Sequence, residues 1–181
     1  VASTDKATGA PKLDGYYLMD YGLGTAAAYS GIMATVDSAD NTNFQVGDVL
    51  SIKAEHIEYY CMSELSLESF VVVGSVTVAE PLTINPQDLG TQTPGTAEPL
   101  EGVLVQILDV TVTNANPDGT KVYGHFQVTG DVIVGNDFGL AYMNKDTSGR
   151  TVGDQFAKIV GVVKYDYGQY LLMPRSMDDL V

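Results

Sequence analysis

An internal repeat constrains the fold of this chain more than any other feature of its sequence. The stretch from Val46 to Glu68 has the same outline as a later stretch, Val152 to Ser176. Sliding one onto the other by 106 positions (152 minus 46) needs no gap and superposes Val46-Gly47-Asp48 on Val152-Gly153-Asp154, Ile57 on Val163, Tyr59 on Tyr165 and Leu65 on Leu171. Two copies of one supersecondary unit predict two similar folded bodies in tandem.

Each copy begins with a Gly-Asp turn directly before a run rich in Val, Ile and Tyr, which predicts a strand after the turn. In the second copy Gly161 lies inside this run, where a glycine usually marks a bulge or a sharp bend of a small closed sheet. Tyr167-Gly168-Gln169-Tyr170 predicts a hairpin turn into a second strand, 171–173, which Pro174 ends. The repeated unit is therefore expected to be a β-hairpin.

Further short segments rich in β-branched and aromatic residues predict more strands, at 15–20, 30–36, 70–79, 103–113, 122–128 and 132–134. Gly74 is expected to form a bulge in its segment. No window has convincing helical periodicity, apart from one helical turn allowed at 86–90. We therefore predict an all-β chain built as two tandem small barrels.

Composition divides the chain between residues 82 and 100, where Pro, Thr, Gly and Gln dominate as they do in linkers. We expect the first barrel at 1–81, the linker at 82–100 and the second barrel at 101–181. These sizes are small, but they are sufficient for domains that fold alone.

The first barrel is expected to lack most of its opening strand. The second barrel opens with the strand near Val103, and the offset of 109 between Gly124 and Gly15 places the equivalent of Val103 upstream of Val1. A small barrel without one strand exposes unpaired backbone beside an apolar groove. Such an edge is a template for an added strand.

Charge and hydropathy limit the partners of this chain. Its 23 acidic and 9 basic residues give a net charge of −14, which repels nucleic acid and anionic lipid. Its apolar fraction of 45% fits a packed globular protein, and no apolar run has the ~18 residues of a membrane helix. No signal peptide is visible, and Val1 is typical of a processed or trimmed start.

Few residues offer catalytic chemistry. A nucleophilic triad needs a histidine, and the chain has only His56 and His125. His56 lies in a predicted strand between Glu55 and Glu58, where ordinary strand placement explains it. Cys61 has no metal-ligand spacing and is expected to be a small buried hydrophobe. We therefore expect no enzymatic activity.

Calcium is the most serious cofactor hypothesis, because hard cations bind several carboxylate and carbonyl oxygens from loops. The loop 37–43 offers Asp37, Asp40, Asn41 and Asn43. A second loop offers Asn114, Asn116 and Asp118. Neither has the EF-hand spacing, and turns use the same residues to bond their own backbone, so both interpretations remain open.

Tyrosines are frequent enough to form a stacking face for bases or sugars. The candidates are Tyr16, Tyr17, Tyr59, Tyr60, Tyr165, Tyr167 and Tyr170. The alternative interpretation is cross-strand packing. Lys53, Lys158 and Lys164 are too few to follow a phosphate chain, so packing is the favoured interpretation.

The segments GYYLMD, YSGIMATV, VGDVLSIKAEHIEYY, EGVLVQILDVTVTNANPDG and VGDQFAKIVGVVKYDYGQYLLMPRS together span nearly the whole chain. They resemble the tandem OB-like modules of large secreted bacterial proteins. Some of these modules accompany extracellular endonucleases, and others lie beside lamin-tail-like or anchoring domains. The resemblance implies OB-like barrels and an extracellular or cell-surface location. It carries over no catalytic residue, because catalysis in such proteins belongs to a separate nuclease domain.

Two functions are consistent with this sequence. The first is a non-enzymatic, secreted or surface β-module that interacts with itself or with neighbouring domains, as a subunit of an assembly built by strand addition. The alternative is a nucleic-acid- or polysaccharide-binding accessory module of a secreted nuclease. Membrane insertion and nucleic acid as the main partner are disfavoured by the hydropathy and the charge.

Overall fold

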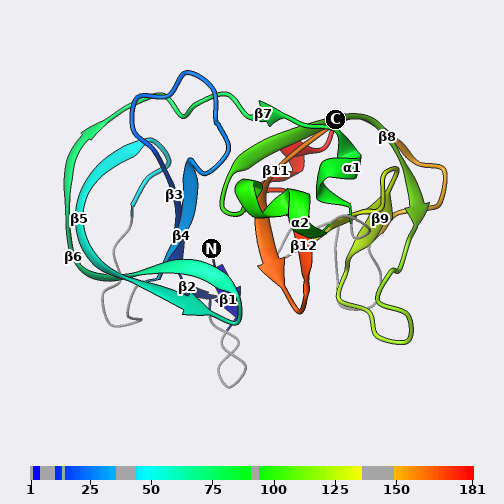
Figure 1. Cartoon of the computed structure of the whole chain (residues 1–181). Helices are drawn as coiled ribbons and strands as arrows, with labels where there is room; N and C mark the ends of the chain where they lie inside the picture. The colour runs from blue at the N-terminus through cyan, green and yellow to red at the C-terminus, as the bar shows by residue number, and fades with distance from the viewer. Residues whose placement is uncertain (1, 5–10, 14, 36–43, 91–93, 136–148) are drawn as a thin grey trace.

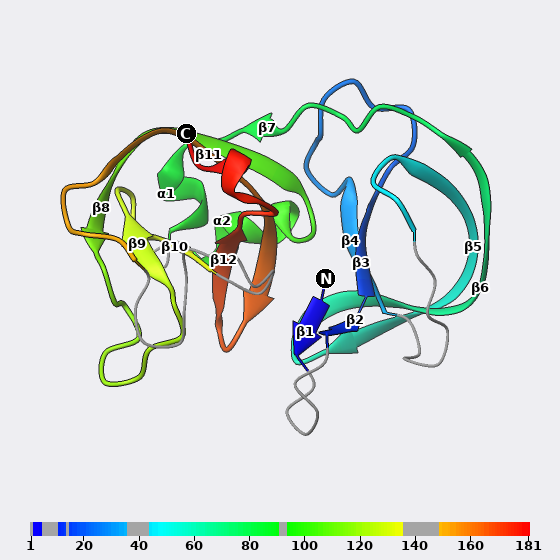
Figure 2. The same ribbon diagram turned by 180° about the vertical axis from the view of Figure 1, so that it is seen from behind.

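The computed structural model describes residues 2–4, 11–13, 15–35, 44–90, 94–135 and 149–181. They form a mostly β protein with one closed five-stranded barrel and a separate four-stranded sheet. The barrel and the sheet lie side by side, and both views show this arrangement (Figures 1 and 2). The expectation of a mostly β chain is confirmed.

The four-stranded sheet is formed by the first part of the chain. Its strands are β3 (Gly15–Met19), β4 (Gly31–Thr35), β5 (Asp48–Tyr59) and β6 (Met62–Ser75), in the order β3-β4-β6-β5. β4 and β6 are parallel, and the other neighbours are antiparallel. β1 (Ala2–Thr4) pairs with β2 (Pro11–Leu13) in a ladder of their own.

The barrel is formed by β8 (Leu104–Asn114), β9 (Phe126–Val128), β10 (Val132–Val134), β11 (Gln155–Asp166) and β12 (Gln169–Met173). Its order is β8-β9-β10-β12-β11, and β11 closes the barrel by pairing with β8. β10 and β12 are parallel. The strands β3, β4, β6 and β5 therefore follow the same order and directions as β9, β10, β12 and β11, and β8 has no counterpart among the described strands of the first sheet.

The repeat corresponds to two equivalent hairpins. Tyr59 pairs with Met62 across one turn, and Asp166 pairs with Gln169 across the other. Both turns have two central residues with positive φ, as type I′ turns require. The ungapped alignment is correct at the Gly-Asp turns, but at the hairpins the equivalent residues are 107 apart, because the second copy is one residue longer between its turn and its hairpin.

Two strand predictions need correction. The segment 70–79 is not a separate strand, because β6 runs without a break from Met62 to Ser75. Gly74 does lie beside a register shift, as expected, since Val49 pairs with Gly74 and the next residue pairs with Val72. The predicted strand 122–128 contains only β9, at Phe126–Val128.

The predicted linker packs against the barrel. It contains β7 (Leu82–Thr83), α1 (Pro86–Leu89), α2 (Pro94–Ala97) and a 3₁₀ turn, Glu98–Leu100. β7 pairs in parallel with β8, and Leu89, Ala97 and Leu100 are buried in the barrel core. This segment is thus packed against the barrel despite its Pro- and Thr-rich composition, because burial of its apolar side chains is favourable.

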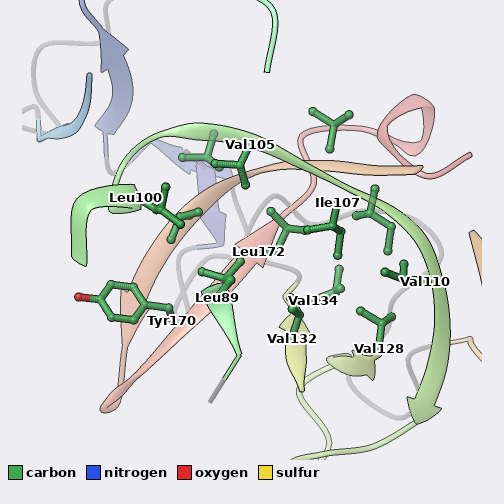
Figure 3. Packing of buried hydrophobic residues seen from close by; sticks show 14 of the residues in the cluster. Leu89, Leu100, Val105, Ile107, Val110, Val128, Val132, Val134, Tyr170 and Leu172 are labelled. Carbon is green, nitrogen blue, oxygen red and sulfur yellow. The ribbon is translucent and has the colours of Figure 1, made fainter. Parts of the chain in front are cut away.

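The hydrophobic core belongs mainly to the barrel. Ile107 and Leu172 are fully buried there, together with Leu89 of α1 and valines of β8, β9 and β10 (Figure 3). Phe126 and Ile159 are fully buried in the same core. The first sheet contributes only a few buried apolar residues, among them Met33 and Ala34. Buried apolar area is the main stabilising contribution to folding, so the two bodies are unequally stabilised.

The chain ends with a second 3₁₀ turn (Met177–Asp179) that closes against β11. Leu180 bridges to Ile159, and Lys158 and Val181 exchange two backbone hydrogen bonds. Asp179 is buried and accepts hydrogen bonds from the backbone and guanidinium of Arg175. Burial opposes ionisation of Asp179, but these hydrogen bonds outweigh it and hold the pKa of the carboxyl below its usual range.

Candidate functional site: an apolar groove beside an unpaired strand edge

A cavity of about 800 Å³ lies between the first sheet and the barrel. Residues of β3, β4 and β5 form one wall, and the other includes Leu104 of β8 and Val162 of β11. Most of its accessible lining is apolar, with Asp20, Asp48 and Arg175 among the charged residues at its surface. Cavities of this size and character are typical of binding sites.

An aromatic cluster fills one end of the first sheet. Phe44 lies 4.7 Å from the ring of Tyr16 and 4.8 Å from the ring of Phe70. The barrel has a similar cluster, in which the guanidinium of Arg150 lies over Phe126 and Phe156. Phe44 directly precedes Gln45, where the first Gly-Asp turn begins, and Arg150 directly precedes Thr151, where the second begins. The two clusters are therefore built around equivalent positions of the repeat.

The turns themselves are also equivalent. The carboxylate of Asp48 accepts a hydrogen bond from the backbone N–H of Gln45, at 2.8 Å. The carboxylate of Asp154 accepts one from the N–H of Thr151, at 2.9 Å. At both positions the aspartate side chain stabilises the turn by accepting a hydrogen bond from the backbone three residues earlier, as expected of a turn aspartate.

The outer edge of β5 forms the rim of the groove. In the barrel, the equivalent edge of β11 pairs with β8 from Gln155 to Val162. In the described part of the chain, β5 pairs only with β6, so its outer edge forms no ladder. A long edge strand with free backbone donors and acceptors is a site where another strand can add.

The apolar side chains of β5 are correspondingly less buried than those of β11. Val49 and Leu50 are half-buried and Ile52 is 36% exposed. On β11, Ile159 is completely buried, and Val160 and Val162 are 5% exposed. In the described part of the chain, no strand pairs with the outer edge of β5 as β8 pairs with β11.

Exposed apolar side chains also lie along β6. Val71, Val72 and Val73 are between 49% and 63% exposed, and Val46, in the turn before β5, is 89% exposed. Consecutive residues of a strand point to opposite faces of the sheet, and single exposed apolar residues are ordinary, so the three valines of β6 do not extend the groove.

The junction between the sheet and the barrel is a close contact between backbones. A Cβ atom added to Gly31 would lie 2.1 Å from the carbonyl oxygen of Gly102. The N–H of Tyr29 donates to the carbonyl of Pro99 at 2.7 Å, and the N–H of Ser63 donates to the carboxylate of Glu101 at 2.8 Å. These contacts fix the width of the groove, because they hold one wall against the other.

Acidic side chains gather at this junction. Glu64 is 6% exposed, and its burial raises the pKa of its carboxyl although Lys164 partly offsets the effect. Burial also raises the pKa of Glu101, the hydrogen bond from Ser63 lowers it, and Glu98, Glu58 and Glu64 add repulsion. One carboxylate oxygen of Glu101 is buried without a hydrogen-bond partner among the described residues.

Tyr170 connects the barrel to the same acidic group. Its hydroxyl donates to the carboxylate of Glu98. Burial raises the pKa of Tyr170, and the hydrogen bond to Glu98 raises it further. The junction therefore holds two carboxyl groups, those of Glu64 and Glu101, whose pKa is raised mainly by burial, and such groups make the stability of a contact depend on pH. Nothing in the sequence pattern indicated this cluster, because its members come from four separate segments.

Of the two candidate calcium loops, the structure describes only the second. Asp37, Asp40, Asn41 and Asn43 lie outside the described residues. In the second loop, Asn114 accepts a hydrogen bond from the N–H of Asn116, and Asn116 donates to the carbonyl of Gly119. These side chains stabilise the turn, as the alternative interpretation has it. Among the described residues, no group of three His, Cys, Asp or Glu side chains is arranged to hold a metal ion.

The two histidines lie beside carboxylates, and the cysteine lies at a turn. His125 lies 3.0 Å from Asp118 and fixes the loop before β9, and His56 is exposed on β5 with Glu58 at 3.6 Å. The expectation of a buried Cys61 is wrong, because Cys61 is exposed at the β5–β6 hairpin turn with φ of +65°. A position with positive φ normally takes glycine, as Gly168 does in the equivalent turn, and Cys61 does not indicate a turn by its residue type.

The tyrosines do not form one stacking face. Tyr59 and Tyr60 pack edge to face at one hairpin turn, and Tyr165 and Tyr170 pack together in the barrel. Tyr167 is 98% exposed at the other hairpin turn. Two tyrosines that the sequence analysis passed over, Tyr21 and Tyr29, line the groove and are more than 70% exposed.

None of the helices in the described part of the chain is long and apolar enough to cross a membrane. No curated protein and no solved structure matches this chain. A family model does match it, over residues 72–180, which are 109 of its 181 residues and include the whole closed barrel. The chain therefore belongs to the family described as a domain of unknown function (DUF8508).

Proposed function

We propose that this chain is a non-enzymatic interaction module whose first sheet is a barrel without one strand, and that it receives that strand from another polypeptide. The observation that carries the proposal is the outer edge of β5, which forms no ladder in the described part of the chain and borders an apolar groove. An added strand would pair with this edge and cover the half-buried side chains of β5. The barrel gives the precedent, because β8 does both for β11.

The same comparison supports an interpretation as two tandem OB-like barrels. In the second body, β11 lies beside β8 after the meander β8-β9-β10, which is a Greek-key order. A five-stranded Greek-key barrel is the architecture of the OB fold. The resemblance of the sequence to OB-like modules of secreted proteins supports an extracellular or cell-surface location, and the proposed role there is that of a subunit in an assembly built by strand addition.

Peptide binding tests strand addition directly. The probe is a labelled peptide with the sequence of residues 102–114, which contains β8, titrated with the intact chain and followed by fluorescence anisotropy. Saturable binding is expected, with slower hydrogen exchange at the backbone amides of Val49 to Glu55. The same peptide with Ile107→Pro should not bind, because proline removes a backbone donor and disfavours the strand.

Matched variants of the chain complete the test. Ile52→Asn places a polar side chain in the groove and should weaken peptide binding about ten-fold or more, by the lost burial of one isoleucine. Val71→Asn is the control, because Val71 is 63% exposed and does not line the groove. Equal binding by the two variants, or protection of β11 amides in place of β5 amides, contradicts the proposal.

A second function is favoured by Tyr21 and Tyr29, whose rings are exposed at the groove. Exposed aromatic rings beside a cavity suit stacking on sugars or unpaired bases, as in an accessory module of a secreted nuclease. This alternative predicts salt-sensitive binding of single-stranded DNA, or binding of a soluble polysaccharide. A flat titration with both ligands at low salt eliminates it.

A further inference from the structure

The β8 strand specifies what an added strand must look like, provided that the proposed strand addition occurs. β8 runs antiparallel to β11, with Leu104 opposite Val162 and Thr111 opposite Gln155. The paired region is therefore eight residues long, from Leu104 to Thr111. A strand that fills the same place beside β5 must be about as long and antiparallel to it.

The side chains of β8 divide into two sets. Val105, Ile107 and Val110 are almost completely buried in the barrel core. Leu108 and Thr113 are exposed, and Gln106 is half-buried beside Thr83. An added strand likewise needs apolar residues toward the groove, while its other face is free to carry polar or charged residues.

The charge of the acceptor decides which residues suit that other face. Residues 15–35 and 44–81 contain seven Asp and Glu and one Lys. The single cation, Lys53, is already paired with Glu68. Glu55 and Glu58 are exposed on β5 itself, and Asp20 and Asp48 line the groove.

We infer that the partner of this groove is a basic β-strand of a different protein, with apolar residues on one face and Lys or Arg on the other. A second copy of this chain fits poorly, because each copy carries a net charge of −14 and the two would repel each other. Opposite charges across neighbouring strands attract, whereas like charges placed opposite each other are destabilising. Complementary charge also accelerates association.

Three peptides that share the sequence of residues 102–114 test this inference on the intact chain. The first is unchanged, the second carries Gln106→Lys, Leu108→Lys and Thr113→Lys, and the third carries Glu at the same three positions. The apolar face is identical in all three. Binding is measured by fluorescence anisotropy at about 0.02 M and about 0.5 M salt, since surface charge is strongly screened only at the higher concentration.

The lysine peptide is expected to bind about ten-fold more tightly than the unchanged peptide at low salt, and the glutamate peptide about ten-fold more weakly. The three affinities should converge at high salt. Equal affinities at low salt overturn the inferred basic partner but leave strand addition standing. Binding by none of the three overturns strand addition itself.

Self-association is measured separately by analytical ultracentrifugation of the chain alone, at low and high salt. A monomer at low salt is expected. A dimer or polymer at low salt that protects the amides of β5 from hydrogen exchange overturns the inference, because a second copy is then the occupant.

Discussion

The contact between Gly31 and Gly102 makes a sharp prediction about the junction that shapes the groove. In Gly31→Ala, the new Cβ atom would lie 2.1 Å from the carbonyl oxygen of Gly102, and real contacts of this kind are essentially never below 3.0 Å. The two backbones must therefore separate by about 0.9 Å. Neither contact partner can rotate away, because both are main-chain atoms.

The cost of this separation can be estimated from its parts. Overpacking typically costs about 1–3 kcal/mol. The hydrogen bond from Tyr29 to Pro99, now 2.7 Å, is stretched or lost, at a cost of about 1 kcal/mol. Replacing glycine restricts the unfolded chain and returns about 0.4–1 kcal/mol. We expect the junction to be destabilised by about 2 kcal/mol.

Native-state hydrogen exchange measures this local free energy. The amides of Tyr29 and Ser63 both donate across the junction, so in Gly31→Ala they should exchange about 30-fold faster. The amide of Gly135, which donates to Leu172 within the barrel, should change little. Gly24→Ala is the matched control, because an added Cβ meets no atom within 4 Å there. If Gly31→Ala and Gly24→Ala exchange alike at Tyr29, the junction does not depend on the close contact of the two backbones.

Three further predictions concern ionisation and the core. Asp179→Asn should lower the free energy of unfolding by about 1–3 kcal/mol, because it removes a buried acceptor from Arg175. Folding lowers the pKa of Asp179, so this contribution is present above the unfolded pKa and is lost as the pH falls through the folded pKa. Urea denaturation in acid should therefore give the variant and the parent chain the same stability. Burial is the main cause that raises the pKa of Glu101 on folding, so its ionised form opposes the junction above the folded pKa and this opposition is relieved as the pH falls through that value. The protection of the Ser63 amide, corrected for the pH dependence of the exchange reaction itself, should therefore increase as the pH falls; Glu101→Gln should remove this increase, and an unchanged increase in the variant rules out Glu101 as its source. Leu172→Ala, at a completely buried position, should cost about 2–5 kcal/mol by thermal unfolding, and a loss below about 1 kcal/mol would mean that the barrel core repacks.

The features that the sequence predicted best are the two repeated Gly-Asp turns. A Gly-Asp turn before a β-branched run is visible without any knowledge of the fold, and both such turns are present with the expected aspartate hydrogen bonds. The position count between the repeats also predicts that the first sheet has no equivalent of β8, and in the described part of the chain β5 pairs only with β6.

What the sequence did not disclose depends on contacts between distant segments. The turn at Tyr60-Cys61 lacks the glycine that marks its equivalent at Gly168, so the buried position expected for Cys61 was wrong. Leu89 and Leu100 are too sparse to show helical periodicity, yet they anchor the supposed linker in the core. The residues next to Gly31 do not indicate that a glycine is needed there, because the need arises from the close approach of the backbone at Gly102, 71 positions away.

The unequal burial of the two bodies connects the fold to the proposed function. In the barrel, β8 covers β11 and places Ile107 and Val110 in a core with almost no exposed atoms. Ile52 on the first sheet is in the equivalent strand and has no such cover in the described part of the chain. An added strand would bury apolar surface that is already arranged on paired strands, so little backbone entropy of the acceptor is lost on binding. In the described part of the chain the first sheet has few fully buried apolar side chains, and the contacts of Gly31 and Tyr29 hold it against the barrel, which has most of them.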